Sequence, residues 1–250
     1  MANHWYLSSV VGTADINTDP AALTKKTGAF SAMTATDVFP TLLSLTGAGT
    51  KTTPFANNDI IYVADDHSET FASDVTIGGD VDAAVGFHIM ISVDATACDA
   101  YKLPASTQID TGAYTLKPRQ FHFFGVDITS ADTSYGIYIV TSSYQTAGFY
   151  GVKLESTDAT SYIVAVAGTG HTNVNLKNST LTASNTGVSV FYSLLAMCHY
   201  DVDGCTFAGA ASNWLAMITG NRPIDLKVKN CDFLISPSFN CLISKLFDNP

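Results

Sequence analysis

The sequence predicts an all-β protein folded as a right-handed parallel β-helix, with coils of about 26 residues and a small N-terminal cap region that contains a short helix. Two observations support this fold class. Charged residues make up 14% of the chain, whereas glycine, small polar, β-branched and aromatic residues are frequent, as is typical of strands and turns. In addition, segments that lie 26 residues apart resemble one another, which indicates a solenoid of stacked coils.

The repeat is clearest in the second half of the chain. LKNSTL (176–181), VDGCTF (202–207) and VKNCDF (228–233) align with one another, and FGVDITSAD (124–132) aligns with YGVKLESTD (150–158). Joining both sets gives one apolar column: Phe124, Tyr150, Leu176, Val202 and Val228. Coils stacked about 4.8 Å apart turn such a column into a continuous core.

A second column marks a corner of each coil. Asn178, Gly204 and Asn230 share one position of the repeat, and these residue types best tolerate a left-handed backbone. We therefore expect a sharp corner there between two short strands. The apolar column that follows is Leu181, Phe207 and Phe233, and a further strand is expected in each coil at 135–140, 162–166, 187–191, 214–218 and 241–244.

The first half of the chain is expected to divide at residue 57. Residues 1–57 would form the cap and attachment region, with a strand in HWYLSS (4–9), and residues 58–250 the β-helix, with irregular first coils that include strands at 86–93 and 113–124. A short helix is predicted over Thr36–Leu45, capped by Thr36 or Asp37 and ended by Gly47. Such a helix would cover the open end of the first coil, whose unpaired edges would otherwise invite aggregation.

The entry into the repeat resembles a known family. The opening strand, the short helix and the turn into NDIIYVADDHSETF (58–71) are similar to the start of pectin-lyase-like right-handed β-helix proteins, especially those of tailed bacteriophages. The resemblance spans nearly the whole chain and implies the architecture. The family includes polysaccharide lyases and hydrolases, phage tailspikes, and virion proteins without enzymatic activity, so the resemblance leaves the activity open.

Charge and composition exclude several classes of partner. A net charge of -10, with Arg119 and Arg222 as the two arginines, argues against nucleic-acid binding. The N-terminus MANHWYLSS lacks the features of a signal peptide, and no apolar run approaches a membrane span of about 20 residues. We therefore expect folding in a cytoplasm without a membrane partner. Five cysteines without a C-x-x-C spacing predict neither a zinc site nor a disulfide framework, and no cofactor is expected.

The densest cluster of ionisable residues is Asp65, Asp66, His67 and Glu69. Two carboxylates with a histidine could bind a cation or a ligand, or serve acid–base chemistry. The alternative is a polar turn between two strands, because aspartate and serine are favoured in turns. The polar turn is the preferred interpretation, and the cluster remains a weak candidate site.

Other candidate residues also have structural explanations. Asp201 and Asp203 lack the further oxygen ligands of a calcium loop. Resemblance to the lyases implies acidic residues beside a basic one on an outer face. The residues that could imitate this arrangement are Asp127, Lys153 and Glu155. However, Asp127 with Lys153, and the column Lys177, Asp203 and Lys229, are explained equally by ion pairs between stacked strands.

Cysteines and aromatic residues complete the set of candidates. Cys205 and Cys231 share one repeat position with Ser179, and packed thiols are preferred there over a disulfide. Cys98, Cys198 and Cys241 fit core positions. The tyrosines and tryptophan that could stack on sugars, or belong to the core, are Tyr62, Tyr101, Tyr144, Tyr150 and Trp214.

These expectations lead to two hypotheses of function. The first is a non-enzymatic structural virion protein of a tailed phage, made in the host cytoplasm and exposed on capsid or tail as a decoration or adhesion element. Its partners would be other virion proteins. The alternative is a tailspike-like protein that binds a bacterial surface polysaccharide, or cleaves it as a lyase or glycoside hydrolase. The family resemblance also suggests a homo-oligomer, such as a trimer. The last coil is expected to need a covering partner, an oligomer contact, or a self-cap from residues 245–250.

Overall fold

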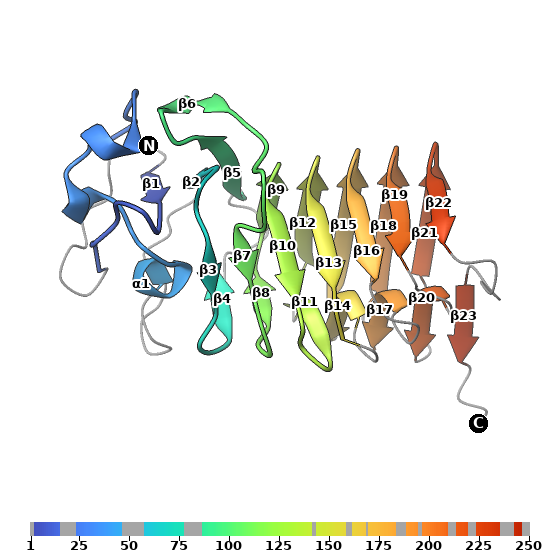
Figure 1. The fold of residues 1–250 in the computed structure, drawn as a ribbon. Helices are drawn as coiled ribbons and strands as arrows, with labels where there is room; N and C mark the ends of the chain where they lie inside the picture. Colours follow the sequence, from blue (N-terminus) through green and yellow to red (C-terminus); the bar gives the residue numbers. More distant parts are fainter. Residues whose placement is uncertain are drawn as a thin grey trace.

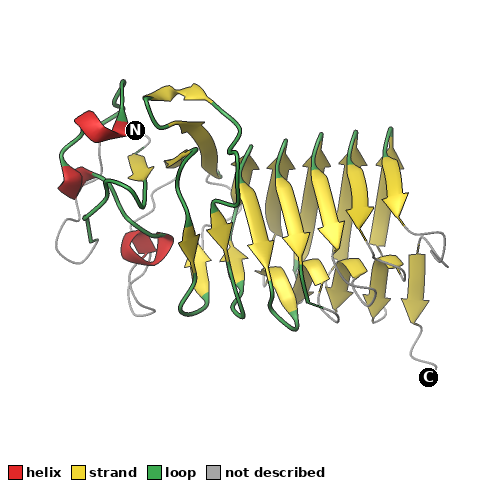
Figure 2. Ribbon diagram, in the orientation of Figure 1, coloured by secondary structure: helices red, strands yellow, loops and turns green. Residues whose placement is uncertain are grey.

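The computed structural model describes residues 3–15, 24–46, 58–77, 87–141, 144–158, 162–168, 170–183, 189–194, 197–209, 214–219, 224–235 and 243–246. Over these residues the chain winds into a solenoid of three parallel sheets, with successive coils stacked side by side (Figures 1 and 2). The predicted parallel β-helix is confirmed. Among the described residues, no helix has the length and apolar character that crossing a membrane requires.

The first sheet is the longest and includes the strand that opens the chain. Its order is β1 (His4–Leu7), β2 (Ile60–Ala64), β5 (His88–Asp94), β9 (Phe121–Phe124), β12 (Tyr144–Tyr150), β15 (His171–Lys177), β18 (Met197–Asp203) and β21 (Ile224–Lys229). One further strand, β6 (Ala97–Tyr101), pairs antiparallel with β5 and forms an arm beside the coils (Figure 1).

The other two sheets receive one strand from each coil. The second sheet contains β3 (Glu69–Thr70), β7 (Ile109–Asp110), β10 (Asp127–Ser130), β13 (Lys153–Ser156), β16 (Thr180–Ala183), β19 (Thr206–Gly209) and β22 (Asp232–Ile235). The third contains β4 (Val75–Ile77), β8 (Leu116–Pro118), β11 (Tyr135–Thr141), β14 (Tyr162–Gly168), β17 (Ser189–Leu194), β20 (Trp214–Thr219) and β23 (Ile243–Leu246). The strands predicted late in each repeat are those of the third sheet from β11 onward.

The single apolar column predicted from the sequence is wrong by one residue in its first two members. Tyr150 pairs with Lys177, whereas Leu176 pairs with Phe149. The inward column is therefore Phe123, Phe149, Leu176, Val202 and Val228. Ser130 pairs with Ser156 but Tyr135 pairs with Tyr162, so this coil gains its extra residue between Ser156 and Tyr162. Because side chains alternate between faces, a slip of one residue moves Phe124 and Tyr150 to the outer face.

The corner after the first sheet is confirmed, and it extends further than predicted. Asn178, Gly204 and Asn230 have φ values of 50°, 64° and 53°. Gly125 and Gly151, with φ values of 65° and 60°, occupy the same place in the two preceding coils. A left-handed residue therefore turns the chain from the first sheet into the second in each of these coils. Asparagine and glycine fill the position because other side chains are strained in this conformation.

The core lies between the three sheets and consists of stacked, inward-facing side chains. Phe123 and Phe149 are fully buried, with ring centroids 5.2 Å apart and planes 3° apart. In the second sheet, the predicted column of Leu181, Phe207 and Phe233 is confirmed, and the last two rings stack at 5.0 Å. Each coil thus buries its apolar residues against the next coil, as a solenoid requires.

The predicted helix is shorter than expected and begins later. A 3₁₀ turn, η2 (Ala35–Asp37), is followed by extended backbone in which Phe39 bridges to Leu7, and the helix α1 spans Leu42–Thr46. Pro40 explains the break, because the residue before a proline disfavours helical backbone. Thr41 caps the helix in place of Thr36 or Asp37: its Oγ1 accepts the Ser44 backbone N–H at 3.0 Å. The predicted stop, Gly47, lies outside the described residues.

The N-terminal region covers the first coil in two ways. Leu42 and Leu45 of α1 are fully buried in the main core, as the predicted capping role requires. A second apolar cluster lies on the other side of the first sheet, where Tyr6 and Tyr62 stack at 5.2 Å and the 3₁₀ turn η1 (Phe30–Ala32) contributes Phe30. The region therefore protects the strand edges that begin the solenoid. The C-terminal self-cap suggested for residues 245–250 extends beyond the described residues.

Candidate functional site

The cluster predicted from the sequence does not converge on one site. Asp65 and Asp66 form the turn after β2. Asp65 accepts the Ala95 backbone N–H at 2.7 Å and pairs with Lys102 at 2.8 Å, whereas Asp66 is exposed. Asp65 therefore anchors the β5–β6 arm. Among the described residues, no three His, Cys, Asp or Glu side chains are grouped so that they could hold a metal ion.

His67 and Glu69 connect the cap to the first coil. The His67 side chain is fully buried, and its Nδ1 accepts the Ser9 backbone N–H at 2.9 Å. Nδ1 is the acceptor in this bond, so the ring hydrogen lies on Nε2. Nε2 lies 3.3 Å from Glu69 Oε1, although the two atoms are not aligned for a hydrogen bond. Glu69 Oε2 accepts the Leu42 backbone N–H at 2.9 Å, which fixes the start of α1.

A concave feature of the described surface is a groove of about 320 Å³ along the left-handed corner. We call it the corner groove. One wall is formed by Tyr101, the last residue of β6, together with Leu103 and Pro104, and the floor is the corner of three successive coils. Its polar lining residues are Asp127, Lys153, Asn178 and Thr180. The groove thus combines an aromatic residue from the arm with polar side chains from β10, β13 and β16.

The charges in this groove are largely neutralised within the protein. Lys153 Nζ lies 3.5 Å from Asp127 Oδ2 and 3.6 Å from Glu155 Oε2. Burial raises the pKa of Asp127, and the nearby Lys153 opposes this effect. Asp127 Oδ1 is enclosed and has no hydrogen-bond partner among the described residues. The structure therefore brings together the acidic and basic residues that the sequence suggested as a lyase-like group.

Tyr101 projects over the corner glycines. Tyr101 is 53% exposed. A Cβ added at Gly125 would lie 2.5 Å from the Tyr101 hydroxyl oxygen. A Cβ at Gly151 would lie 3.4 Å from the same atom. Glycine at these two positions therefore provides the left-handed corner, and at Gly125 it also leaves space for the Tyr101 ring.

An aromatic strip lies on the outer face of the first sheet, next to the corner. It consists of Phe87, His122, Tyr150 and Phe124. The ring centroids of Phe124 and Tyr150 are 4.8 Å apart, those of His122 and Tyr150 are 5.8 Å apart, and those of Phe87 and His122 are 4.4 Å apart. Phe87 is 46% exposed, so apolar ring surface remains open to solvent here.

The remaining candidates have structural roles in the described residues. Asp203 pairs with Lys229 at 3.2 Å and accepts the Asn230 side-chain amide at 2.9 Å, and both partners lower its pKa. Asp201 lies in β18, opposite Lys227 of β21. The predicted charged column of Lys177, Asp203 and Lys229 is thus confirmed.

The cysteines and other tyrosines also have defined places. Cys205 and Cys231 are free thiols, and burial raises the pKa of Cys205 to about 11. Cys98 and Cys198 are buried, whereas Cys241 lies outside the described residues. Tyr62 is buried in the cap cluster, so it cannot present its ring to a sugar. The side chains of Tyr144 and Trp214 are outside the described part of the structure.

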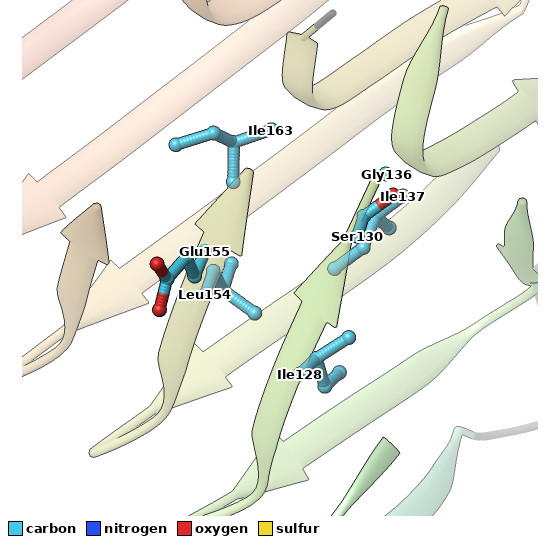
Figure 3. Close-up of a pocket in the computed structure, with 7 residues that line it drawn as sticks. All are labelled: Ile128, Ser130, Gly136, Ile137, Leu154, Glu155 and Ile163. Atoms are coloured by element: carbon cyan, nitrogen blue, oxygen red, sulfur yellow. The ribbon is translucent and has the colours of Figure 1, made fainter. Parts of the chain in front are cut away.

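A second cavity lies at the seam between the second and third sheets. It is lined mostly by apolar residues, including Ile128, Ile137, Leu154 and Ile163, and has a volume of about 10 Å³. Figure 3 shows the Glu155 carboxylate turned away from Ile128. The space is close to the minimum for a single water molecule, so it is a packing gap and not a ligand site.

Sequence reasoning missed two features of this region. Asp59 is fully buried, with Oδ2 accepting the Trp5 indole N–H at 3.0 Å and Oδ1 accepting the Asn3 backbone N–H at 2.9 Å. Its contacts are with a strand far away in the sequence, so no local pattern marks it. The position of Tyr101 over the corner was also missed, although Gly125 carries a signal of it.

Comparison with known proteins found no match: no family model, no curated protein and no solved structure matches the chain.

Proposed function

We propose that this chain is a non-enzymatic structural protein of a tailed-phage particle, exposed on the capsid or tail as a decoration or adhesion element. The observation that carries the proposal is the use of its acidic residues. Asp65 holds the arm, Glu69 holds the helix, and Asp203 pairs with Lys229 of the next coil. Side chains that might have served chemistry are instead engaged in stabilising a rod.

The architecture suits a passive, exposed element. Stacked coils give a rigid body whose outer columns are polar, and pairs such as Lys229–Asp203 and Lys153–Asp127 link neighbouring coils. The net charge of -10 favours solubility and repulsion between particles. The phage setting itself comes from the resemblance of the N-terminal half to β-helix proteins of tailed phages.

Mass spectrometry of purified phage particles tests this proposal. Peptides of the chain should be present at a constant ratio to a major capsid or tail protein after density-gradient purification. Their absence from particles whose genome encodes the chain would contradict the virion role. Native mass spectrometry of the isolated protein tests the associated proposal of a homo-oligomer, such as a trimer. A monomer alone would contradict it.

A second candidate function, cleavage of a bacterial surface polysaccharide, is favoured by one observation. Asp127 has a raised pKa, lines the corner groove, and is linked through Lys153 to a second carboxylate, Glu155. Glycosidases use a carboxyl group with a raised pKa together with a second carboxyl group. Incubation of the protein with host capsule or lipopolysaccharide should then shorten the chains, and Asp127→Asn should abolish the shortening. Unchanged chain lengths would reject this function.

A further inference from the structure

We propose that the corner groove binds one or two residues of an uncharged sugar chain. The proposal rests on the adhesion role inferred above for its biological setting, but its location and ligand class are argued from the groove itself. At about 320 Å³, the space is at the lower end of the range of about 300–1,000 Å³ for small-molecule sites. It is therefore large enough for a short glycan segment and too small for a protein domain.

The apolar part of the site is the Tyr101 ring. Its place is fixed by the pairing of Tyr101 with Val93 and by the ion pairs of the next residue, Lys102, with Asp65 and Asp94. More than half of Tyr101 is exposed although the residue is held by the arm. A fixed, exposed aromatic ring offers a flat apolar surface at little cost in conformational entropy, which suits the C–H face of a sugar ring.

The polar part of the site comes from neighbouring coils. Asp127 lines the groove, and its Oδ2 lies 3.5 Å from Lys153 Nζ. Asn178 and Thr180, which carry an amide and a hydroxyl group, line the same groove. A carboxylate oxygen can accept more than one hydrogen bond, so Asp127 Oδ2 could accept one from a ligand as well as the contact from Lys153. Sugar hydroxyls both donate and accept, and they match this mixed set.

The charges in the groove select against ionic ligands. Lys153 would attract a uronate or phosphate, but Asp127 and Glu155 already neutralise it. The net charge of -10 further repels polyanions. A cationic ligand would in turn meet the Lys153 ammonium inside the groove. An uncharged sugar chain is the remaining class that uses both the ring and the polar groups without an electrostatic penalty.

The aromatic strip extends this surface along the chain. Phe124 and Tyr150 immediately precede Gly125 and Gly151, so their stacked rings lie on the first sheet next to the groove. A longer glycan that leaves the groove in this direction would continue over apolar ring surface. The geometry therefore points to a site that accommodates an internal segment of a polymer as well as its end.

Affinity electrophoresis tests the proposal with the full chain. Native gels are cast with dissolved dextran, mannan, arabinogalactan or neutral host surface polysaccharide, and parallel gels contain polygalacturonate or chitosan. The wild-type protein should be retarded by at least one neutral polymer and by neither charged one. Tyr101→Ala should weaken the retarding interaction at least about tenfold, equivalent to about 1.4 kcal/mol. Circular dichroism would confirm that the variant is folded.

Tyr114→Ala provides the matched control, because Tyr114 is also an exposed tyrosine, at 38%, but does not line the groove. This variant should be retarded like the wild type. Migration unaffected by every neutral polymer, or equal retardation of wild type and Tyr101→Ala, would overturn the site. This test and the particle test can fail separately. If the protein binds a neutral glycan but is absent from virions, the binding site stands and the virion role is rejected.

Discussion

The corrected register predicts that Phe149 and its neighbour Tyr150 differ sharply in their contribution to stability. Phe149 is fully buried and stacks on Phe123 at 5.2 Å, so Phe149→Ala should cost about 3–5 kcal/mol. Tyr150 is on the outer face and contacts Phe124 at 4.8 Å, so Tyr150→Ala should cost about 0.5–1.5 kcal/mol. A 26-residue spacing from Tyr150 to Leu176 would instead place Tyr150 in the core and reverse the order.

Thermal and urea unfolding, each followed by circular dichroism, measure both variants. For a chain of this length, Phe149→Ala should lower Tm by about 6–20 °C, whereas Tyr150→Ala should lower it by no more than about 6 °C. The slope of the urea transition should stay constant if both variants unfold from the same fold. A larger loss for Tyr150→Ala than for Phe149→Ala would refute the register and, with it, the outward position of the aromatic strip.

Three further predictions concern the cap, the histidines and the corner. Glu69→Ala removes the acceptor of the Leu42 N–H and should lower the stability of the cap by about 1–3 kcal/mol. Limited proteolysis should then cleave residues 3–46 faster than in the wild type, and unchanged cleavage would contradict this role of Glu69. Burial lowers the pKa of His88 and His122, so the unfolded chain takes up protons first. Stability should therefore be full above about pH 6.5 and fall as the pH drops below it; urea midpoints test this, and a flat profile would be contrary. At Gly151, φ is 60° and an added Cβ would make only an ordinary contact with the Tyr101 hydroxyl oxygen, at 3.4 Å. Gly151→Ala should therefore cost about 1–2 kcal/mol and Gly151→Asn clearly less; equal costs would contradict the left-handed corner.

The solenoid could be predicted because its determinants repeat. Apolar residues recur at one coil spacing, and the left-handed corner admits few residue types, so Asn178, Gly204 and Asn230 identify it directly. The strand positions of the third sheet followed from the same spacing. These features depend on local backbone preference and on burial, which a sequence displays without knowledge of distant contacts.

The register error shows that a pattern of apolar residues does not by itself determine which residues of stacked strands pair. Tyr150 and Leu176 are both apolar enough for a core column, so hydrophobicity alone could not distinguish them. The backbone requirement is stricter: Gly151 and Asn178 must occupy the same left-handed corner, and aligning them gives the 27-residue coil. A constraint on φ therefore fixes register better than a column of apolar residues does.

The candidate site could be predicted less well, because its parts come from distant segments. His67 and Glu69 are explained by Ser9 and Leu42, which precede them by many residues and reach them only after the cap has folded. Local sequence showed a polar turn, which is correct for Asp65 and Asp66 but hides the buried connection beside it. The groove depends likewise on where the β5–β6 arm places Tyr101.

Glycine at position 125 nevertheless carries a signal of Tyr101 in the sequence. Backbone conformation does not separate glycine from asparagine at the corner, since Gly151 and Asn178 have φ values of 60° and 50°. At Gly125 the available space requires glycine, because the Cβ of any other residue would lie 2.5 Å from the Tyr101 hydroxyl oxygen. Asn178 lies in the next coil beyond Gly151 and is one of the residues that line the groove. At the following corner, Gly204, an added Cβ would lie 2.5 Å from Asn178 Oδ1, so there too a neighbouring side chain occupies the space that a larger residue would need. Gly125→Asn should displace Tyr101 and weaken neutral-glycan binding, whereas Asn230→Gly, outside the groove, should leave binding unchanged.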